Sequence, residues 1–124
     1  MRDLARNRLR WASAGLHDYE FDYQLSCFCA PEATEAVHIV VRNDQVAGVT
    51  RTRDGLAAVR QYGTWPTVAD LFEDVGRQLE REAERIEVTY DPTYGYPRSI
   101  VVDVYLMAAD DESSQTAANL RPLP

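Results

Sequence analysis

The feature that most constrains the fold is a change in the spacing of apolar residues near residue 18. Before it, from about Asp3 to Gly15, apolar side chains recur every three or four residues. After it, they alternate with polar ones, at Tyr19, Phe21, Tyr23, Leu25, Cys27 and Cys29. The first spacing is typical of an amphipathic helix and the second of a half-buried strand, so both kinds of element have to share one core.

Both spacings return further along the chain. Asn43-Asp44 is a turn signal that predicts a hairpin. Thr67 as N-cap and Asp70 three residues later form a capping box, which predicts a second helix. Residues 56–60 are interpreted as a short helix. Alternating apolar residues predict five further strands, over residues 37–41, 45–53, 86–90, 100–107 and, more weakly, 113–120.

The resulting order is helix, three strands, helix, three strands (α-β-β-β-α-β-β-β). The 124 residues are one domain's length, so we expect a single two-layer α+β domain over residues 1–124. Its helices should pack on one face of an antiparallel sheet. Residues 19–23 echo residues 86–90 just after each helix, which either an internal duplication or a chance match of short strand patterns explains.

Charge narrows the classes of partner. The chain carries a net charge of −7 at pH 7, and its thirteen basic residues are all arginine. The lack of lysine excludes lysine Schiff-base chemistry and a P-loop lysine. An acidic chain disfavours nucleic acid and anionic membranes as main partners and favours a protein with a basic surface. No apolar run approaches the roughly 18 residues that span a bilayer, and the charged opening segment predicts no signal peptide.

The sequence lacks the motifs of common enzyme classes. It holds no G-x-S-x-G elbow, H-E-x-x-H helix, phosphate-binding glycine loop or dinucleotide fingerprint. The spacing does not favour a pair of Cys29 with His17 or His38, and residues 110–112 lack the spaced acids of a calcium loop. We therefore assign no catalytic residue, no metal site and no cofactor, and the sequence favours a non-catalytic domain.

Cys27 and Cys29 are the two cysteines of the chain, and one residue separates them. On a flat strand their Cα atoms would lie about 6.6 Å apart with parallel side chains, whereas a disulfide needs Cβ atoms about 4 Å apart. A bend before Pro31 would bring them together. Three interpretations stay open: a structural disulfide, two buried unreactive thiols, or a redox or soft-metal site.

Residues 91–97 form a predicted turn that is rich in tyrosine. Pro92 fixes one backbone position and Gly95 permits a positive φ. In one interpretation the turn is rigid and its tyrosines pack back on the sheet. In the other, Tyr94 and Tyr96 are presented to a partner, since tyrosine is enriched at binding hot spots.

Polar residues on alternate strand positions predict an acidic sheet face. If Tyr19 and Ile100 face the helices, the residues that face the other way are Glu20, Asp22, Gln24, Ser26, Glu87, Thr89, Asp103 and Tyr105. Such a face binds a basic protein surface or a cationic ligand, or is the solvated side of an acidic protein.

The sequence thus predicts a non-catalytic binding domain that uses the exposed sheet face and the turn. Its candidate residues are Glu20, Asp22, Tyr94, Tyr96, Asp103 and Tyr105. The alternative is a small redox or metal-handling protein that uses Cys27 and Cys29.

Several segments occur in an order that resembles a known family: Cys27-Phe28-Cys29, Thr67-Val68 with Leu71-Phe72, residues 88–97, and Ile100 through Asp103. The most specific is Tyr-Asp-Pro-x-Tyr-Gly-Tyr-Pro at residues 90–97. From about Trp11 to Leu120 the chain resembles a bacterial family of uncharacterised domains, many of them small exported proteins or lipoproteins. The resemblance implies an extracytoplasmic setting and transfers no catalytic residue. By analogy, the fold is expected to be similar to the β-lactamase-inhibitor-protein type, with helices over a curved antiparallel sheet.

Overall fold

The computed structural model describes residues 2–27, 34–58, 64–81, 85–103 and 112–124. Within them it has two helices and six strands, in the order predicted from the sequence, and the fold class is α+β. The elements are α1 (Arg2–Ala14), β1 (Tyr19–Ser26), β2 (Val37–Arg42), β3 (Gln45–Arg51), α2 (Val68–Glu80), β4 (Arg85–Tyr90), β5 (Pro97–Asp103) and β6 (Glu112–Pro122).

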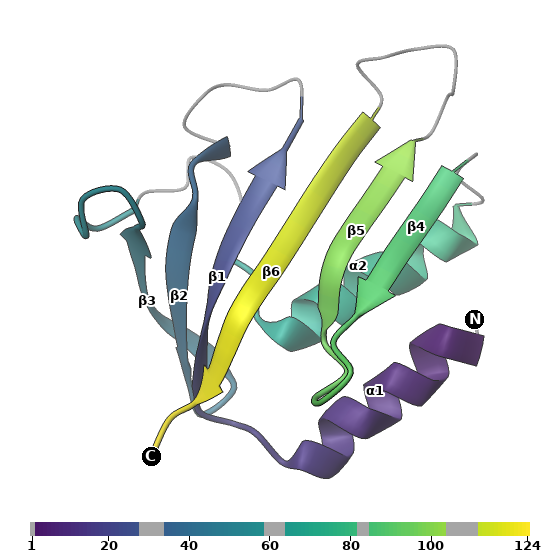
Figure 1. The fold of residues 1–124 in the computed structure, drawn as a ribbon, viewed down its shortest axis with the longest axis horizontal. Coiled ribbons are helices and arrows are strands. Elements are labelled where there is room, and N and C mark those ends of the chain that lie inside the picture. Colours follow the sequence, from purple (N-terminus) through teal and green to yellow (C-terminus); the bar gives the residue numbers. More distant parts are fainter. Residues whose placement is uncertain (1, 28–33, 59–63, 82–84, 104–111) are drawn as a thin grey trace.

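The six strands form one antiparallel sheet with the order β3-β2-β1-β6-β5-β4 (Figure 1). The strand predicted most weakly, β6, is the longest at 11 residues and lies between β1 and β5. Its weak signal has a physical reason, because Ala117 and Leu120 are the buried apolar residues of a strand that is otherwise mostly polar. The C-terminal strand therefore joins the two halves of the sheet.

The sheet order bears on the internal duplication. β1 and β4 each follow a helix, but β1 lies inside the sheet whereas β4 forms one of its edges. The sheet order gives no support to a duplication, which stays a prediction.

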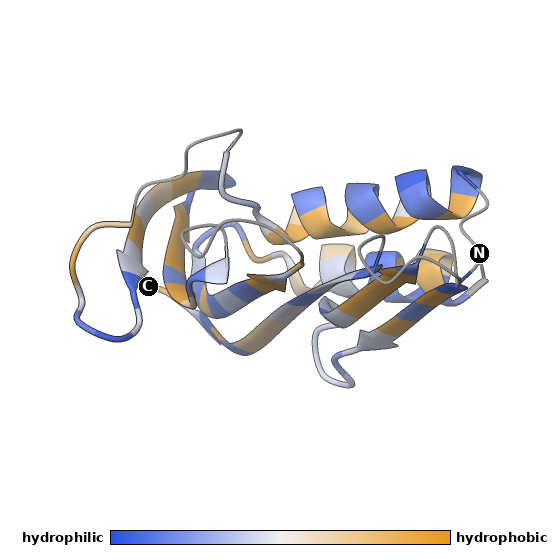
Figure 2. Cartoon of the chain, turned by 90° about the horizontal axis from the view of Figure 1, so that it is seen from above, coloured by the Kyte–Doolittle hydropathy of each residue, from blue (hydrophilic) through white to orange (hydrophobic). Residues whose placement is uncertain are grey.

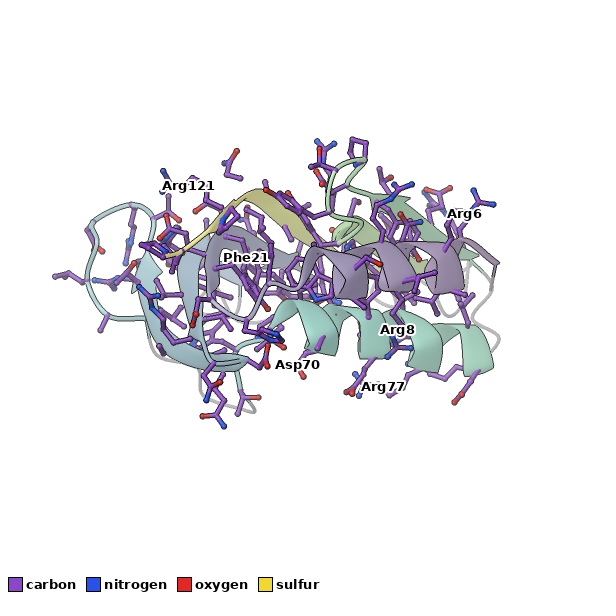
Figure 3. The ribbon with its side chains drawn as sticks, turned by 90° about the horizontal axis from the view of Figure 1, so that it is seen from below. Arg6, Arg8, Phe21, Asp70, Arg77 and Arg121 are labelled. Atoms are coloured by element: carbon purple, nitrogen blue, oxygen red, sulfur yellow. The ribbon has the colours of Figure 1, made fainter. Side chains whose placement is uncertain are left out.

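The helices form the second layer. α2 lies across one face of the sheet and contacts β5 and β4 (Figures 1 and 2). Figure 2 shows the hydrophobic side of α2 turned towards the sheet. α1 contacts α2 and runs beside it, at the end of the sheet where β4 turns into β5 (Figures 1 and 3). The core between the layers includes the fully buried Phe21, Ile39, Leu71, Phe72 and Ile100.

The amphipathic helix predicted from about Asp3 to Gly15 is confirmed as α1, but not all of its apolar residues face the core. Leu4 is buried and Trp11 packs against the core, but Leu9 is 68% exposed. The polar Asn7 is buried instead, and its side-chain amide donates a hydrogen bond to the backbone oxygen of Asp3 at 2.8 Å. α1 therefore buries a narrow side and leaves the rest in solvent.

The hairpin between β2 and β3 confirms the predicted turn. Asn43 and Asp44 have φ values of 52° and 63°, as a two-residue hairpin with the right twist requires. The short helix expected at 56–60 is wrong for its described part. Ala57 forms a β-bridge with Thr50, so this segment returns along β3, and residues 59 and 60 lie outside the described residues.

The N-terminus of α2 is held by two sets of hydrogen bonds. Thr67 and Asp70 form the predicted capping box. In addition, the backbone N–H of Val68 donates to the phenol oxygen of Tyr19 on β1 at 2.9 Å. Tyr19 is 2% exposed, and its burial raises the pKa of the phenol to about 12 although this N–H donor lowers it. The capping phenol thus ties α2 directly to the sheet.

We expect Tyr19→Phe to lower the free energy of unfolding at pH 7 by about 1–2 kcal/mol, because the Val68 N–H stays buried without its acceptor. Urea unfolding followed by circular dichroism measures the change. Tyr94→Phe, at a half-buried tyrosine, is the control and should lose less.

Tyr19→Phe should also change how the free energy of unfolding depends on pH. An unfolded tyrosine has a pKa of about 10, so between pH 10 and 12 the unfolded chain loses a proton that folded Tyr19 keeps. The stabilisation is complete below pH 10 and is lost as the pH rises towards 12, by about 2 kcal/mol. Tyr19→Phe should flatten this loss, and an unchanged alkaline profile would contradict the assignment.

Candidate functional site

The predicted acidic residues of β1 lie in a network with a histidine, an asparagine and an arginine from the neighbouring strands. His38 Nδ1 lies 2.8 Å from a carboxylate oxygen of Asp22, and its Nε2 lies 3.7 Å from Glu20. Arg121 pairs with Glu20, and the Asn119 amide donates to Asp22 at 2.9 Å. Partial burial opposes ionisation of Asp22, but the hydrogen bonds from Asn119 and His38 hold its pKa below the ordinary value. This part of the sheet face is not the bare acidic surface that the sequence suggested.

The other predicted residues of this face lie apart from that network. Asp103 is on β5, with β6 between it and β1. It is 5% exposed, and its Oδ1 has no hydrogen-bond partner among the described residues. Glu87 pairs with Arg85 at 3.1 Å. Tyr105 lies outside the described residues. The structure therefore does not gather the predicted acids into one binding surface.

The tyrosine turn packs against the body of the protein. Tyr96 is 4% exposed and belongs to the core, so it offers almost no surface to a partner. Its burial raises the pKa of the phenol, while a hydrogen bond with the backbone of Leu120 lowers it. Tyr94 is half-buried and packs against the core. The expectation of two contact tyrosines therefore does not hold for Tyr96.

Gly95 allows this turn to approach α1. Its φ is +86°, and a Cβ atom built there would lie 2.5 Å from the backbone oxygen of Asn7 and 3.1 Å from the Cβ of Arg10. Asp91 fixes the turn from within, because its carboxylate accepts the N–H groups of Thr93 and Tyr94. The turn is thus a support for α1.

We expect Gly95→Ala to lower the free energy of unfolding by about 2 kcal/mol or more, through the positive φ and the overlap with α1. Gly55→Ala is a matched control, since Gly55 has a φ of +73° and nothing within 4 Å of the added Cβ. Urea unfolding of both variants separates the cost of the positive φ from the cost of the overlap with α1. Equal losses would show that the contact with α1 is unimportant.

Of the two cysteines, the structure describes Cys27. It follows β1, is half-buried and is disulfide-bonded. Cys29 lies outside the described residues. Cys27 is therefore not a buried free thiol, and a structural or a redox disulfide both stay open.

The two histidines each contact a carboxylate. His17 lies 2.9 Å from Asp44, and His38 lies 2.8 Å from Asp22.

A polar groove with a volume of about 420 Å³ lies alongside α2. One wall is the exposed side of α2, and the other consists of β1, β6 and the residues before α2. The groove, called the α2 groove below, is lined by Tyr23, Leu25, Thr64, Pro66, Asp70, Leu71, Glu73, Asp74, Arg77, Gln78, Ser113 and Gln115.

A chain of hydrogen bonds orders the polar groups of the α2 groove. The Tyr23 hydroxyl donates to Gln115 Oε1 at 2.6 Å, and Gln115 Nε2 donates to one oxygen of Asp74 at 2.7 Å. Arg77 donates to the other oxygen of Asp74 at 2.9 Å. The amide of Gln115 therefore bridges the strand wall and the helix wall.

The charge of the α2 groove is negative. It holds three carboxylates, from Asp70, Glu73 and Asp74, against the one guanidinium of Arg77. Asp70 accepts the N–H and the hydroxyl of Thr67 in the helix cap, so its position is fixed. Glu73 is exposed at the rim (Figure 3 labels its neighbours Asp70 and Arg77). The groove is chemically suited to a positively charged group.

Sequence reasoning missed this groove because its walls are distant in the sequence. The signal for one wall was present, since the capping box predicted α2. Gln115 and Ser113 lie on β6, whose place between β1 and β5 was not foreseen. Without that strand order, nothing brings Gln115 to Asp74.

The comparisons place this architecture in a family. A family model described as a family of unknown function, DUF6174, matches residues 3–122. The chain belongs to DUF6174. No curated protein and no solved structure matches it. The resemblance to an uncharacterised family is confirmed at this level, while the bacterial origin and the exported relatives stay predictions.

The described residues of this DUF6174 chain show neither a metal cluster nor a membrane-spanning helix. No group of three or more His, Cys, Asp or Glu side chains among them is arranged to hold a metal ion. Neither helix of this described part is long and apolar enough to cross a membrane.

Proposed function

We propose that this DUF6174 domain is a non-catalytic binding module whose α2 groove takes a positively charged side chain of a protein partner. The observation that carries the proposal is the groove itself, with three carboxylates beside one guanidinium in about 420 Å³. The proposed partner is of the class expected from the sequence, a protein with a basic surface. The proposed site, however, lies at α2 and not on the exposed sheet face.

The order of the groove supports binding. Asp74, Gln115 and Tyr23 are held by one another before any ligand arrives. Groups that are already oriented lose little conformational freedom on binding, which favours affinity. The volume falls within the range of about 300–1,000 Å³ that is usual for ligand sites. Its polar lining suits a lysine or arginine side chain better than an apolar molecule.

A tetra-arginine peptide tests the proposal, with a tetra-glutamate peptide as the opposite charge. Isothermal titration calorimetry should detect the first and not the second. Glu73→Gln removes an exposed rim carboxylate of the groove, and we expect it to weaken binding about three- to fivefold.

Glu87→Gln is the matched control for this variant. It makes the same change of net charge on β4, outside the residues that line the groove. The control should leave the affinity within about twofold. Equal weakening by both variants would assign binding to overall charge, and no binding of tetra-arginine to the parent would contradict the proposal.

We also propose that the domain works outside the cytoplasm with Cys27 and Cys29 joined as a structural disulfide. The bonded state of Cys27 supports this, because disulfides persist in oxidising compartments. Protein purified without reductant should have an intact mass two hydrogens below the reduced chain and resist alkylation until it is unfolded and reduced. Two thiols that react with alkylating agent in the folded protein would contradict it.

A further inference from the structure

The first helix is basic in an acidic chain. α1 contains four of the thirteen arginines and a single acidic residue, Asp3, while the chain as a whole carries a charge of −7. The charges of the protein are therefore segregated, and the remainder of the chain is more acidic than the total suggests. The net charge, from which the sequence disfavoured anionic membranes, does not describe the surface of α1.

Among the described residues, Arg6, Arg8 and Arg10 lack the carboxylate partners that most of the described arginines outside α1 have, with Arg42, Arg81 and Arg98 as the exceptions. In the described part of the chain, five arginines outside α1 form ion pairs with carboxylates: Arg51, Arg53, Arg77, Arg85 and Arg121. Arg6 and Arg8 are exposed, and no ion pair among the described residues includes them. Arg10 is also exposed and donates to the backbone oxygen of Pro92 at 3.3 Å.

Helix stability does not explain this arrangement. Arg6 and Arg10 are four residues apart, the spacing at which like charges repel along a helix. A negatively charged surface would relieve this repulsion, so the arrangement points to a partner.

The exposed side of α1 combines these charges with an apolar residue. Leu9 is 68% exposed, and helical spacing places it between Arg6 and Arg8 on the solvent side. Figure 3 looks onto this side, with Arg6 and Arg8 on opposite flanks of the helix. The exposed side of α1 thus forms a basic ridge along one helix.

We propose that this ridge, formed by Arg6, Arg8, Leu9 and Arg10, docks onto an anionic phospholipid surface. The guanidinium groups would bind lipid phosphates, which they match with paired N–H donors. Leu9 would enter the boundary between headgroups and acyl chains. The combination of exposed arginines with an exposed leucine on one helix favours a lipid surface, which offers both phosphates and acyl chains, over an acidic peptide. This inference is independent of the α2 groove.

Vesicle co-sedimentation tests the proposal with the full chain. Vesicles of phosphatidylcholine with phosphatidylglycerol should retain the protein, vesicles of phosphatidylcholine alone should not, and added salt should weaken binding. Each arginine near an anionic surface strengthens binding about fivefold, so we expect Arg6→Gln with Arg8→Gln to lower the partition coefficient more than tenfold. Leu9→Ser should lower it several-fold.

The matched control is Arg42→Gln with Arg53→Gln, which makes the same change of charge at exposed positions near β2 and β3. Circular dichroism confirms that each variant is folded. The control pair should retain binding within about twofold. Equal loss in both pairs, or no retention of the parent by anionic vesicles, would overturn the proposal. The proposal would also be overturned if the parent protein did not bind vesicles but bound polyglutamate through Arg6 and Arg8. That result would indicate an acidic protein partner.

Discussion

The hydrogen bond from Val68 N–H to the Tyr19 phenol is the contact on which the site depends. It joins the first residue of α2 to β1, at a place where both groups are shielded from water. A buried N–H without an acceptor costs about 1–3 kcal/mol, so the helix and the strand keep this relation. The α2 groove lies between these two elements, and its width is set by how α2 sits on the sheet.

The elements with strong local signals could be predicted from the sequence. The alternation after residue 18 gave β1, the capping box gave α2, and Asn43-Asp44 gave a hairpin turn. Each depends on residues that are close in the chain. The place of β6 depends on which strand pairs with which, and its polar residues carry no signal for a central strand. The groove was lost with it, because Gln115 reaches Asp74 only in that strand order.

The net charge of the chain does not predict how the charged residues are distributed over its surface. Glu20 and Asp22 were expected as an open acidic face, but His38, Asn119 and Arg121 come to them from β2 and from β6. These partners are distant in the sequence, so their effect was invisible there. On α1 the net charge misleads in the opposite way, because this helix is basic although the chain is acidic. A chain with a net charge of −7 presents a helix whose exposed arginines are not neutralised by described carboxylates.

The turn at Gly95 connects these observations. It was selected from the sequence for its tyrosines, yet its backbone is what matters, because the absence of a side chain lets it touch Asn7 of α1. A helix that buries only a narrow side has few other contacts to fix its orientation. The turn therefore determines which side of α1 faces solvent, and with it the direction in which Arg6, Arg8 and Leu9 point. The turn predicted to present tyrosines thus contacts, through its backbone, the helix that we propose to bind anionic lipid.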